Sequence, residues 1–585
     1  MGAFSTLSVF SLAEALRESR NEKTIAIVRD ASVDVSGTLA ATADAWHCAG
    51  ETTLVIGVDE ASCDRMKRAG VREAHVLSVE SLCLRILDDA RVRDITKRDA
   101  RIIDANEYDV LLEDLKVSGL KPRRLREMTK FFLKSLSEYD NETEGWLVTP
   151  EEQLVFALLE ENLEARRAVL PCEAASLAYR GLTESDIDIP RLSIVVDDFG
   201  ALSKSQQRLV LLLADKLIAA GAESGAGLPG QPYPCHEGFS AFANKADRVM
   251  RLESETRPEI STRRYETPIE EFAGVKAQVV MLLEEGFAPE DILIAVPHSL
   301  WAARIADRLV SEGVSVVRVG EKKVKGDPRD ASRCADLKRA AFLKLWRNPG
   351  DMTALRSWMG FGDWLVRSDA FMELLAYARN HDMTAMDAMR ALRAQEPEQR
   401  ETLLFGKFDA ALDELDELRG SLRGATAEKA VEIFETHGMP LDSRQIALLG
   451  NSDALADMDA LAADESAVRC EDVRGVRIAR YEECCAEHAR ATLFCGLVGG
   501  FLPRLDALDE GYTIDHKNRA MARDALLFED ICATPSELLV LSSFEHDLLE
   551  NADALHMRLR RVFVRDGVRC ATVEPSGFLS DYDFE

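Results

Sequence analysis

Short apolar segments that alternate with amphipathic stretches dominate the pattern of this chain. Apolar runs of about four to eight residues between turn-forming residues are typical of buried strands, whereas apolar positions at helical spacing indicate helices. Strands are predicted at residues 24–28, 53–57, 192–196, 291–296, 314–319, 476–480, 491–496 and 538–542. A further segment begins as a strand at residue 76 and turns helical before residue 87. Strands that alternate with helices predict parallel α/β sheets.

The predicted strands fall into two sets, and a long helical region interrupts each set. Residues 100–190 and 335–465 have Leu-rich helical periodicity and few strand signals. A helix is expected from about Ser205, and the Gly- and Pro-rich residues 222–238 are expected to form a loop. The pattern therefore predicts two doubly wound α/β domains, each with a helical insertion.

The length and composition of the chain fit a multidomain globular protein. The chain has 585 residues, 46% of them apolar, which is too long for one hydrophobic core. No apolar run approaches the roughly 20 residues that span a bilayer, because the best candidate, residues 209–220, contains Asp215 and Lys216. The N-terminus lacks the basic start of a secretory signal, and the 12 cysteines are irregularly spaced. We therefore expect a cytoplasmic protein with no membrane partner.

The formal net charge of −30 bears on nucleic-acid binding. Phosphate contacts dominate the affinity of nucleic-acid binders, so such proteins usually have a basic patch. The densest basic stretch runs from Lys121 to Lys134, and Arg123, Arg124 and Lys130 are its tentative DNA-binding residues. The alternative reading of this stretch is the solvated face of a helix. DNA is thus a possible but weakly bound partner.

Several segments have more specific patterns, in a fixed order along the chain. They are residues 27–36, 78–87, 195–206, 252–257, 476–503 and 531–542. In this order they resemble the motifs of UvrD/Rep-type superfamily 1 DNA helicases. The match at 476–503 is the strongest, since it runs without a gap and ends in Gly-Leu-Val-Gly-Gly-Phe-Leu-Pro, close to the family's Gly-Leu-x-Glu-Gly-Leu-Phe-Pro.

The phosphate loop of the family corresponds to residues 27–36. The resemblance places Ser36 where the family has its Mg-binding hydroxyl, whereas Val35 replaces the lysine that neutralises the phosphates. The glycines whose N–H groups wrap a phosphate are also missing. Asp30 and Asp34 would place negative charge beside a negative ligand, which is repulsive.

The resemblance implies further vestigial site residues. Asp197 matches the carboxylate that holds Mg²⁺, and Asp198 replaces the glutamate that activates water. Gln206 and Arg257 match nucleotide-binding positions of the family. The alternative for the acidic pair is a cap on the turn that follows. We expect Asp197 to end a strand that lies beside the strand at residues 24–28.

Other family positions have lost their chemistry as well. Glu80 and Glu482 stand where the family has histidines near single-stranded DNA, and Thr534 replaces the arginine finger. Such a finger is worth about 10³ to 10⁵ in rate. Cys484, Cys485 and His488 do not have a standard zinc spacing, so no metal site is predicted.

The resemblance implies an α/β fold with two RecA-like, P-loop-NTPase-type domains. We expect the first RecA-like domain at residues 1–95 and 190–260, with a helical insertion at 96–189. The second domain is expected at 261–345 and 466–560, with a reduced helical insertion at 346–465. Residues 561–585 are expected to form a C-terminal tail.

Three classes of function remain open. The first is a helicase-like, non-catalytic scaffold or DNA-path subunit in DNA repair or recombination. By analogy with RecBCD- and AddAB-type complexes, its partner would be an active helicase or nuclease. The second is an active DNA-dependent ATPase or helicase with unusual motifs, and only this one implies ATP and Mg²⁺ as cofactors. The third is a protein-interaction module that binds neither DNA nor nucleotide.

Overall fold

The computed structural model divides the chain into two compact units. It describes residues 6–582 except for 8, 20, 31–32, 140–142, 223–232, 253–257, 320–325, 364, 450–457, 459–460, 462–474, 485–486, 510, 512 and 581. The first unit comprises Met1–Val79, Ile189–Glu321 and Cys470–Glu585, and contains both large sheets. The second comprises Glu80–Asp188 and Lys322–Arg469 and is helical.

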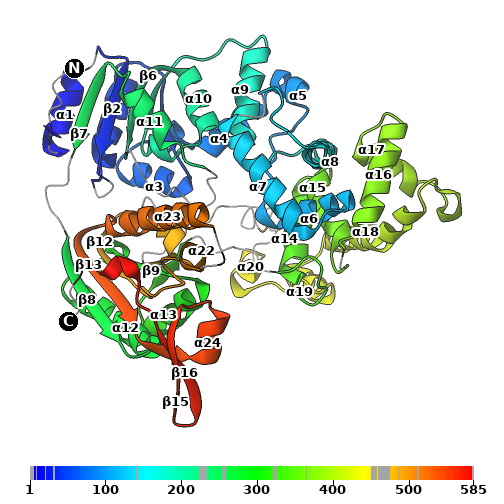
Figure 1. Cartoon of the computed structure of the whole chain (residues 1–585). Coiled ribbons are helices and arrows are strands. Elements are labelled where there is room, and N and C mark those ends of the chain that lie inside the picture. The colour runs from blue at the N-terminus through cyan, green and yellow to red at the C-terminus, as the bar shows by residue number, and fades with distance from the viewer. Residues whose placement is uncertain are drawn as a thin grey trace. The chain divides into compact units, whose positions relative to one another are not determined.

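The first sheet has seven strands in the order β1-β7-β2-β6-β5-β3-β4, all parallel (Figure 1). In chain order these strands are β1 (Thr6–Leu7), β2 (Thr24–Arg29), β3 (Thr53–Gly57), β4 (Val76–Ser78), β5 (Leu192–Val196), β6 (Ala214–Gly221) and β7 (Arg248–Leu252). The predicted strands at 24–28, 53–57 and 192–196 are confirmed, as is the change from strand to helix after residue 76.

One expectation about this sheet needs correction. β5, which leads into Asp197, does not lie beside β2, because β6 pairs with both and separates them. The sequence pattern did not predict β6. Its last residues are buried, so it lacks the alternation of a half-exposed strand, and it directly follows the helix that was predicted. The two strands do share one sheet, as expected.

Several of the described helices pack against the first sheet. They are α1 (Val9–Glu18), α2 (Ser36–Cys48), α3 (Glu60–Arg68), α10 (Lys204–Leu213) and α11 (His236–Ala243). Apolar residues of α1, α2 and α3 form one core with alternate strand residues such as Ile25 and Ile27. The described part of the expected loop at 222–238 ends where α11 begins, at His236.

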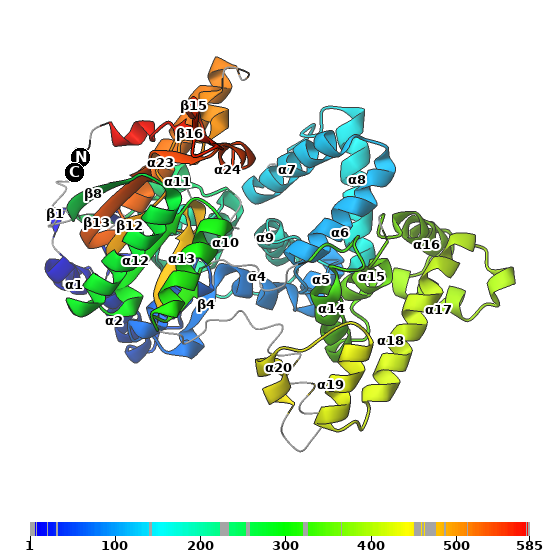
Figure 2. The ribbon, with the colours of Figure 1, turned by 90° about the horizontal axis from the view of Figure 1, so that it is seen from below.

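The second sheet has six parallel strands in the order β10-β11-β9-β12-β13-β8. In chain order they are β8 (Glu259–Tyr265), β9 (Ile292–Val296), β10 (Val316–Arg318), β11 (Val476–Arg480), β12 (Ala489–Phe494) and β13 (Pro535–Phe544). α12 (Pro268–Glu284) and α13 (Ser299–Ser311) pack together on one face, and α23 (Ile514–Cys532) lies on the other (Figures 1 and 2). These two sheets confirm the predicted α/β class with two parallel sheets, as expected of RecA-like domains.

The expected C-terminal tail contains regular structure. An antiparallel sheet in the order β14-β16-β15 is built from β14 (His546–Leu548), β15 (Leu559–Arg565) and β16 (Val568–Val573). The short helix α24 (Leu549–Ala554) joins the core of the second sheet, and the short helix α22 (Leu505–Leu508) packs against α23. The expected tail at residues 561–585 therefore contains most of β15 and all of β16.

The helical unit is built from two segments that are far apart in the sequence. The first segment contains α5 (Ala90–Thr96), α6 (Ala105–Leu115), α7 (Pro122–Glu138), α8 (Pro150–Arg166) and α9 (Ala174–Glu184), and α4 (Val79–Leu87) leads into it. The second contains α14 (Ala335–Arg347), α15 (Met352–Gly360), α16 (Ser368–Asn380), α17 (Ala385–Arg393), α18 (Asp409–Leu422), α19 (Ala427–Thr436) and α20 (Ser443–Leu448). The two insertions therefore share one compact unit, which begins at Glu80 rather than near residue 96.

A buried charge cluster joins the two insertions. The Asp114 carboxylate of α6 accepts hydrogen bonds from Arg166 of α8 and from Arg356 of α15, whose Nε and Nη2 atoms lie 3.0 and 2.5 Å from it. All three side chains are at most 1% exposed, and both guanidinium carbons lie 4.7 Å from the centre of the Phe371 ring.

Among the described helices, none is long and apolar enough to cross a membrane.

We predict that Asp114→Ala destabilises the helical unit by about 3–5 kcal/mol, because it leaves two guanidiniums buried without their carboxylate. The matched control is Asp99→Ala, which removes the carboxylate of the half-exposed Asp99–Arg167 pair and should change stability by about 0–1 kcal/mol. Urea denaturation followed by circular dichroism measures both effects. Equal midpoints for the two variants would contradict the role of the cluster.

Candidate functional site

The carboxyl ends of β2 and β5 bring together the residues that matched nucleotide-binding motifs. Arg29 is the last residue of β2, and Asp197 and Asp198 directly follow β5. Asp198 has a left-handed backbone with φ of 58°, a conformation that aspartate tolerates better than most residues. In parallel α/β sheets, ligands bind at the carboxyl ends of the strands, so this is the expected place for a site.

Arg29 and Arg65 hold the acidic pair in a network of ion pairs. One nitrogen of Arg29, Nη2, lies 3.0 Å from Asp197 Oδ1 and 2.5 Å from Asp198 Oδ1. Arg65 Nη2, which comes from α3, lies 3.6 Å from Asp197 Oδ2 and 3.4 Å from Asp198 Oδ2. The side chains of Arg29 and Asp197 are only 2% exposed. The two carboxylates are thus balanced by two guanidiniums.

The pKa shifts of these groups follow from burial and from their mutual charges. Burial disfavours charge on Arg29, but the Asp198 and Asp197 carboxylates outweigh it and raise its pKa. Burial also opposes ionisation of Asp197, yet Arg29 and Arg65 lower its pKa. For Asp198, burial together with the charge of Asp197 raises the pKa. The network therefore keeps Arg29 protonated and Asp197 ionised.

Side chains near the segment that resembles the phosphate loop form hydrogen bonds with its backbone. Arg29 Nη1 donates a hydrogen bond of 3.1 Å to the carbonyl oxygen of Val33. The Asp34 carboxylate accepts a 2.8 Å hydrogen bond from the backbone N–H of Ser36, the first residue of α2. A helix N-terminus attracts anions, and in a phosphate-binding loop that anion is the ligand. Here a carboxylate of the protein lies at that position.

This arrangement limits what the site can do chemically. A divalent cation at Asp197 would have to displace the Arg29 guanidinium or lie beside it, and either is electrostatically unfavourable. Asp198 is similarly engaged, so it is poorly placed to activate water. Within the described ranges, no cluster of three or more His, Cys, Asp or Glu side chains could hold a metal ion.

The other residues expected at the nucleotide site have different surroundings. Gln206 caps α10, because its Oε1 accepts a 2.8 Å hydrogen bond from the N–H of Ser203. Its neighbour Gln207 is buried and donates to the carbonyls of Phe199, Leu202 and Cys235. Arg257 lies outside the described residues. Helix capping therefore engages the Gln206 side chain, and a nucleotide-binding role for Gln206 and Arg257 stays a prediction.

Two positions at which the chain departs from the family motifs lie in the domain built around the second sheet, called the second sheet domain. Glu482, where the family has a histidine, forms a 3.0 Å ion pair with Arg504. Thr534, where the family has the arginine finger, is 4% exposed and its hydroxyl lies 2.7 Å from that of Thr492. Thr534 is therefore a packed residue that directly precedes β13.

Three members of the site, Arg29, Arg65 and His488, are not among the site residues expected from the sequence. Arg29 and Arg65 were not singled out, although an arginine directly after a buried strand was a visible signal. His488, which precedes β12, was considered only as a metal ligand. Burial and the nearby charges of Arg29 and Arg65 lower its pKa to about 3, so it is neutral beside the cluster. Its Nδ1 is buried and has no hydrogen-bond partner among the described residues.

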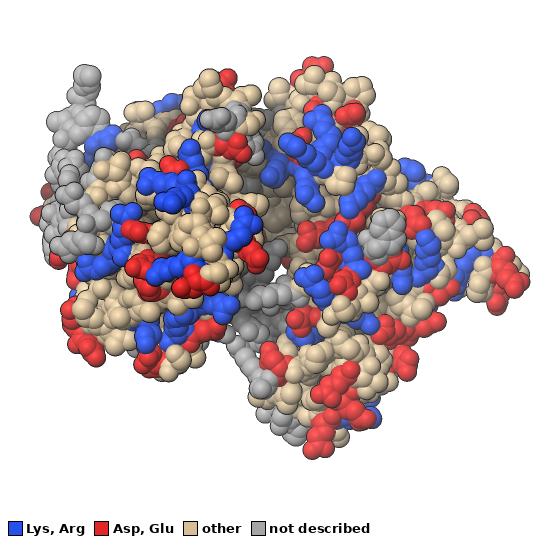
Figure 3. All heavy atoms as spheres, turned by 60° about the horizontal axis from the view of Figure 1, so that its bottom comes forward, with Lys and Arg blue, Asp and Glu red and all other residues tan. Residues whose placement is uncertain are grey.

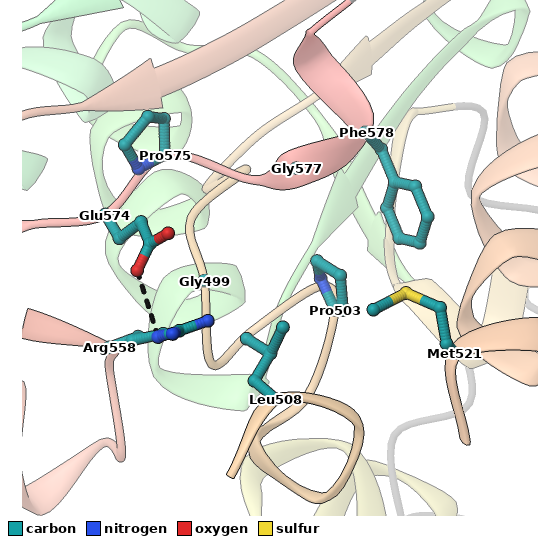
Figure 4. A pocket seen from close by; sticks show the side chains of 9 residues that line it. All are labelled: Gly499, Pro503, Leu508, Met521, Arg558, Glu574, Pro575, Gly577 and Phe578. Carbon is teal, nitrogen blue, oxygen red and sulfur yellow. Dashed lines mark ion pairs between the residues drawn. The ribbon is translucent and has the colours of Figure 1, made fainter. Parts of the chain in front are cut away.

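A cavity of about 230 Å³ lies elsewhere in the second sheet domain (Figure 4). Leu508, Met521 and Phe578 give it an apolar lining, and the Arg558–Glu574 ion pair of 3.0 Å lies at its edge. Pockets for drug-sized ligands usually measure about 300–1,000 Å³, so this cavity is smaller than a typical ligand pocket.

Comparisons with known proteins do not establish a family. No protein-family model matches the chain, and no curated protein matches it. A matching solved structure is the helicase domain of Hef from Pyrococcus furiosus, at 11% sequence identity over 92% of this chain and 95% of that chain, with a TM-score of 0.23.

We predict that Arg29→Met lowers the free energy of unfolding by about 3–5 kcal/mol, because it leaves two carboxylates facing each other in a buried site. Adding Asp198→Asn to this variant should recover part of the loss by removing one of the two charges. The control is Lys23→Met, since the Lys23–Asp215 pair is 69% and 52% exposed and should contribute only about 0–1 kcal/mol. Thermal and urea denaturation measure these changes, and wild-type stability of Arg29→Met would rule out the buried network.

Proposed function

We propose that this chain is a helicase-like protein that has lost ATP hydrolysis and serves as a non-catalytic scaffold or DNA-path subunit in DNA repair or recombination. Its partner would be an active helicase or nuclease, and its compartment the cytoplasm. The observation that supports this proposal best is the ion-paired cluster, in which Arg29 and Arg65 neutralise Asp197 and Asp198.

The cluster argues against an active ATPase for a physical reason. An ATPase of this type needs a carboxylate free to bind Mg²⁺ and a lysine to neutralise the phosphates. Here the carboxylates are already balanced, Val35 stands at the lysine position, and Asp34 occupies the start of α2. Binding ATP·Mg would require breaking a buried ion-pair network and bringing a polyanion next to Asp34. Both steps are unfavourable.

The basic helix α7 supports a DNA contact for the proposed subunit. Its exposed face holds Lys130 and Lys134 as well as Arg123, Arg124 and Arg126. Figure 3 shows Lys and Arg side chains gathered over the part of the helical unit where α7 lies. Glu127 and Glu151 partly neutralise two of the arginines, at 3.2 and 3.7 Å. A surface of this kind offers phosphate contacts without sequence reading, which fits weak, salt-sensitive binding.

We predict that the purified chain shows no tight binding of ATP in the presence of Mg²⁺ and no ATPase activity stimulated by single-stranded DNA. Isothermal titration calorimetry measures the first and a phosphate-release assay the second. Micromolar affinity for ATP·Mg, or DNA-stimulated turnover, would move the protein to the active-helicase class. Circular dichroism of the same sample verifies that it is folded.

We predict that single-stranded DNA binds weakly and that glutamate substitutions at Arg123, Arg124 and Lys130 abolish this binding, because they reverse the charge of the α7 face. Fluorescence anisotropy with a labelled oligonucleotide at several salt concentrations measures the effect.

The matched control changes the same net charge elsewhere on the helical unit. Glutamate at Arg379, Arg390 and Lys429, all more than half exposed, should leave DNA binding nearly unchanged. Equal losses in both triple variants would show that the total charge, and not α7, governs binding. No binding by the wild-type chain in low salt would favour a protein-interaction module.

A further inference from the structure

The antiparallel ribbon formed by β15 and β16 presents an open strand edge. The strand order is β14-β16-β15, so β15 pairs on one side only, with β16. In the described part of the chain no strand pairs with its other side. Figure 1 shows this ribbon projecting beyond α24. An edge strand offers a row of unpaired backbone N–H and C=O groups, which can template pairing with another chain.

The base of the ribbon is firmly attached to the second sheet domain. Ala571 and Val573 of β16 are buried in the core of that domain. The N–H of Gly499 donates to the carbonyl of Glu574, and the N–H of Arg558 donates to the carbonyl of Gly499, both at 2.8 Å. The ribbon is therefore held in place by buried side chains and backbone hydrogen bonds, which preorganise its open edge.

The outer part of the ribbon exposes apolar side chains. Val562, Val564 and Val568 are 46, 67 and 50% exposed, respectively. Each is a β-branched residue in a regular strand, the type that packs well against a neighbouring strand. Edge strands of natural proteins are usually protected from indiscriminate pairing by charges, prolines or cover, and β15 has charges but neither proline nor cover among the described residues. Three exposed valines on an uncovered ribbon are consistent with an interaction surface.

Arginines flank these valines. Between residues 559 and 573 the chain has four arginines and one aspartate, although its net charge is −30. Arg560, Arg561 and Arg569 are exposed and form no ion pair with another described residue. Arg565 lies 3.4 Å from Glu266, with both side chains largely exposed. The ribbon is thus a local basic and apolar surface on an acidic protein.

We infer that the open edge of β15 binds an extended, acidic segment of a partner protein as an added strand. Main-chain hydrogen bonds would provide affinity, and carboxylates opposite the arginines would provide specificity. This inference names the recognition chemistry of the partner and rests on the proposed function only in assuming a protein partner.

The same arginines argue against a second copy of this chain as the occupant. Pairing of two β15 strands would bring their six arginines together in any register, and antiparallel pairing centred on Phe563 would place Arg561 opposite Arg565 at both ends. Parallel pairing in register would align identical arginines. Like charges directly opposite each other destabilise strand pairing. A nucleic acid would use the arginines but would leave the exposed valines and the backbone edge without a partner.

The test uses the full chain and a fluorescent peptide of alternating glutamate and valine. We expect saturable binding, protection of the β15 backbone amides from hydrogen exchange, and at least tenfold weaker binding by the double variant Val562→Glu, Val564→Glu, which removes apolar contacts and repels the acidic peptide. The matched control is Val148→Glu with Val310→Glu, two valines that are 79 and 61% exposed elsewhere and should not affect binding. A peptide with lysine in place of glutamate should not bind.

Several results would overturn the inference. They are no peptide binding by the wild-type chain, equal binding by both double variants, or binding without protection of β15. Loss of oligonucleotide binding by the ribbon variant would identify a nucleic-acid surface instead, and concentration-dependent dimerisation lost in that variant would identify a second copy. None of these results alters the calorimetric test with ATP·Mg, so failure of the two proposals can be told apart.

Discussion

The ion pairs between Arg29 and the Asp197 and Asp198 carboxylates determine the electrostatics of the candidate site. A parallel sheet places the ends of β2 and β5 at one edge, so the side chains that follow these strands must be accommodated together. Two buried carboxylates need a cation, and this chain supplies the cation itself. Arg65 adds a second positive charge beside the two carboxylates, and Asp34 accepts a hydrogen bond from the first N–H of α2. The charges at this edge of the sheet are therefore paired within the chain.

A buried ion pair also connects the two segments of the helical unit. Asp114 comes from the first insertion and Arg356 from the second, and their buried pair can form only when both segments are folded. Isolated helices of this length are marginal in water, so most of their stability comes from packing of this kind. In both units, therefore, charged residues in the interior join segments that lie far apart in the sequence.

The surface shows the opposite use of charge. Basic residues are concentrated on α7 and on the β15–β16 ribbon, although acidic residues prevail in the whole chain. Local basic surfaces on an acidic protein can attract anionic partners while the remaining surface repels them, which favours defined docking over non-specific association. This division supports the proposed role as a subunit that positions other molecules.

The sequence by itself determined the α/β class, most of the strands and the position of the acidic pair. Buried strands such as those at 53–57 and 192–196 have apolar runs between turn residues, which a one-dimensional pattern records directly. The sequence did not reveal β6, because its apolar residues continue those of the preceding helix. It did not reveal the β15–β16 ribbon either, because the arginines of β15 interrupt its apolar residues. Only the tertiary structure decided that Arg29 neutralises Asp197, because an ion pair between residues 168 positions apart depends on the order of strands in the sheet.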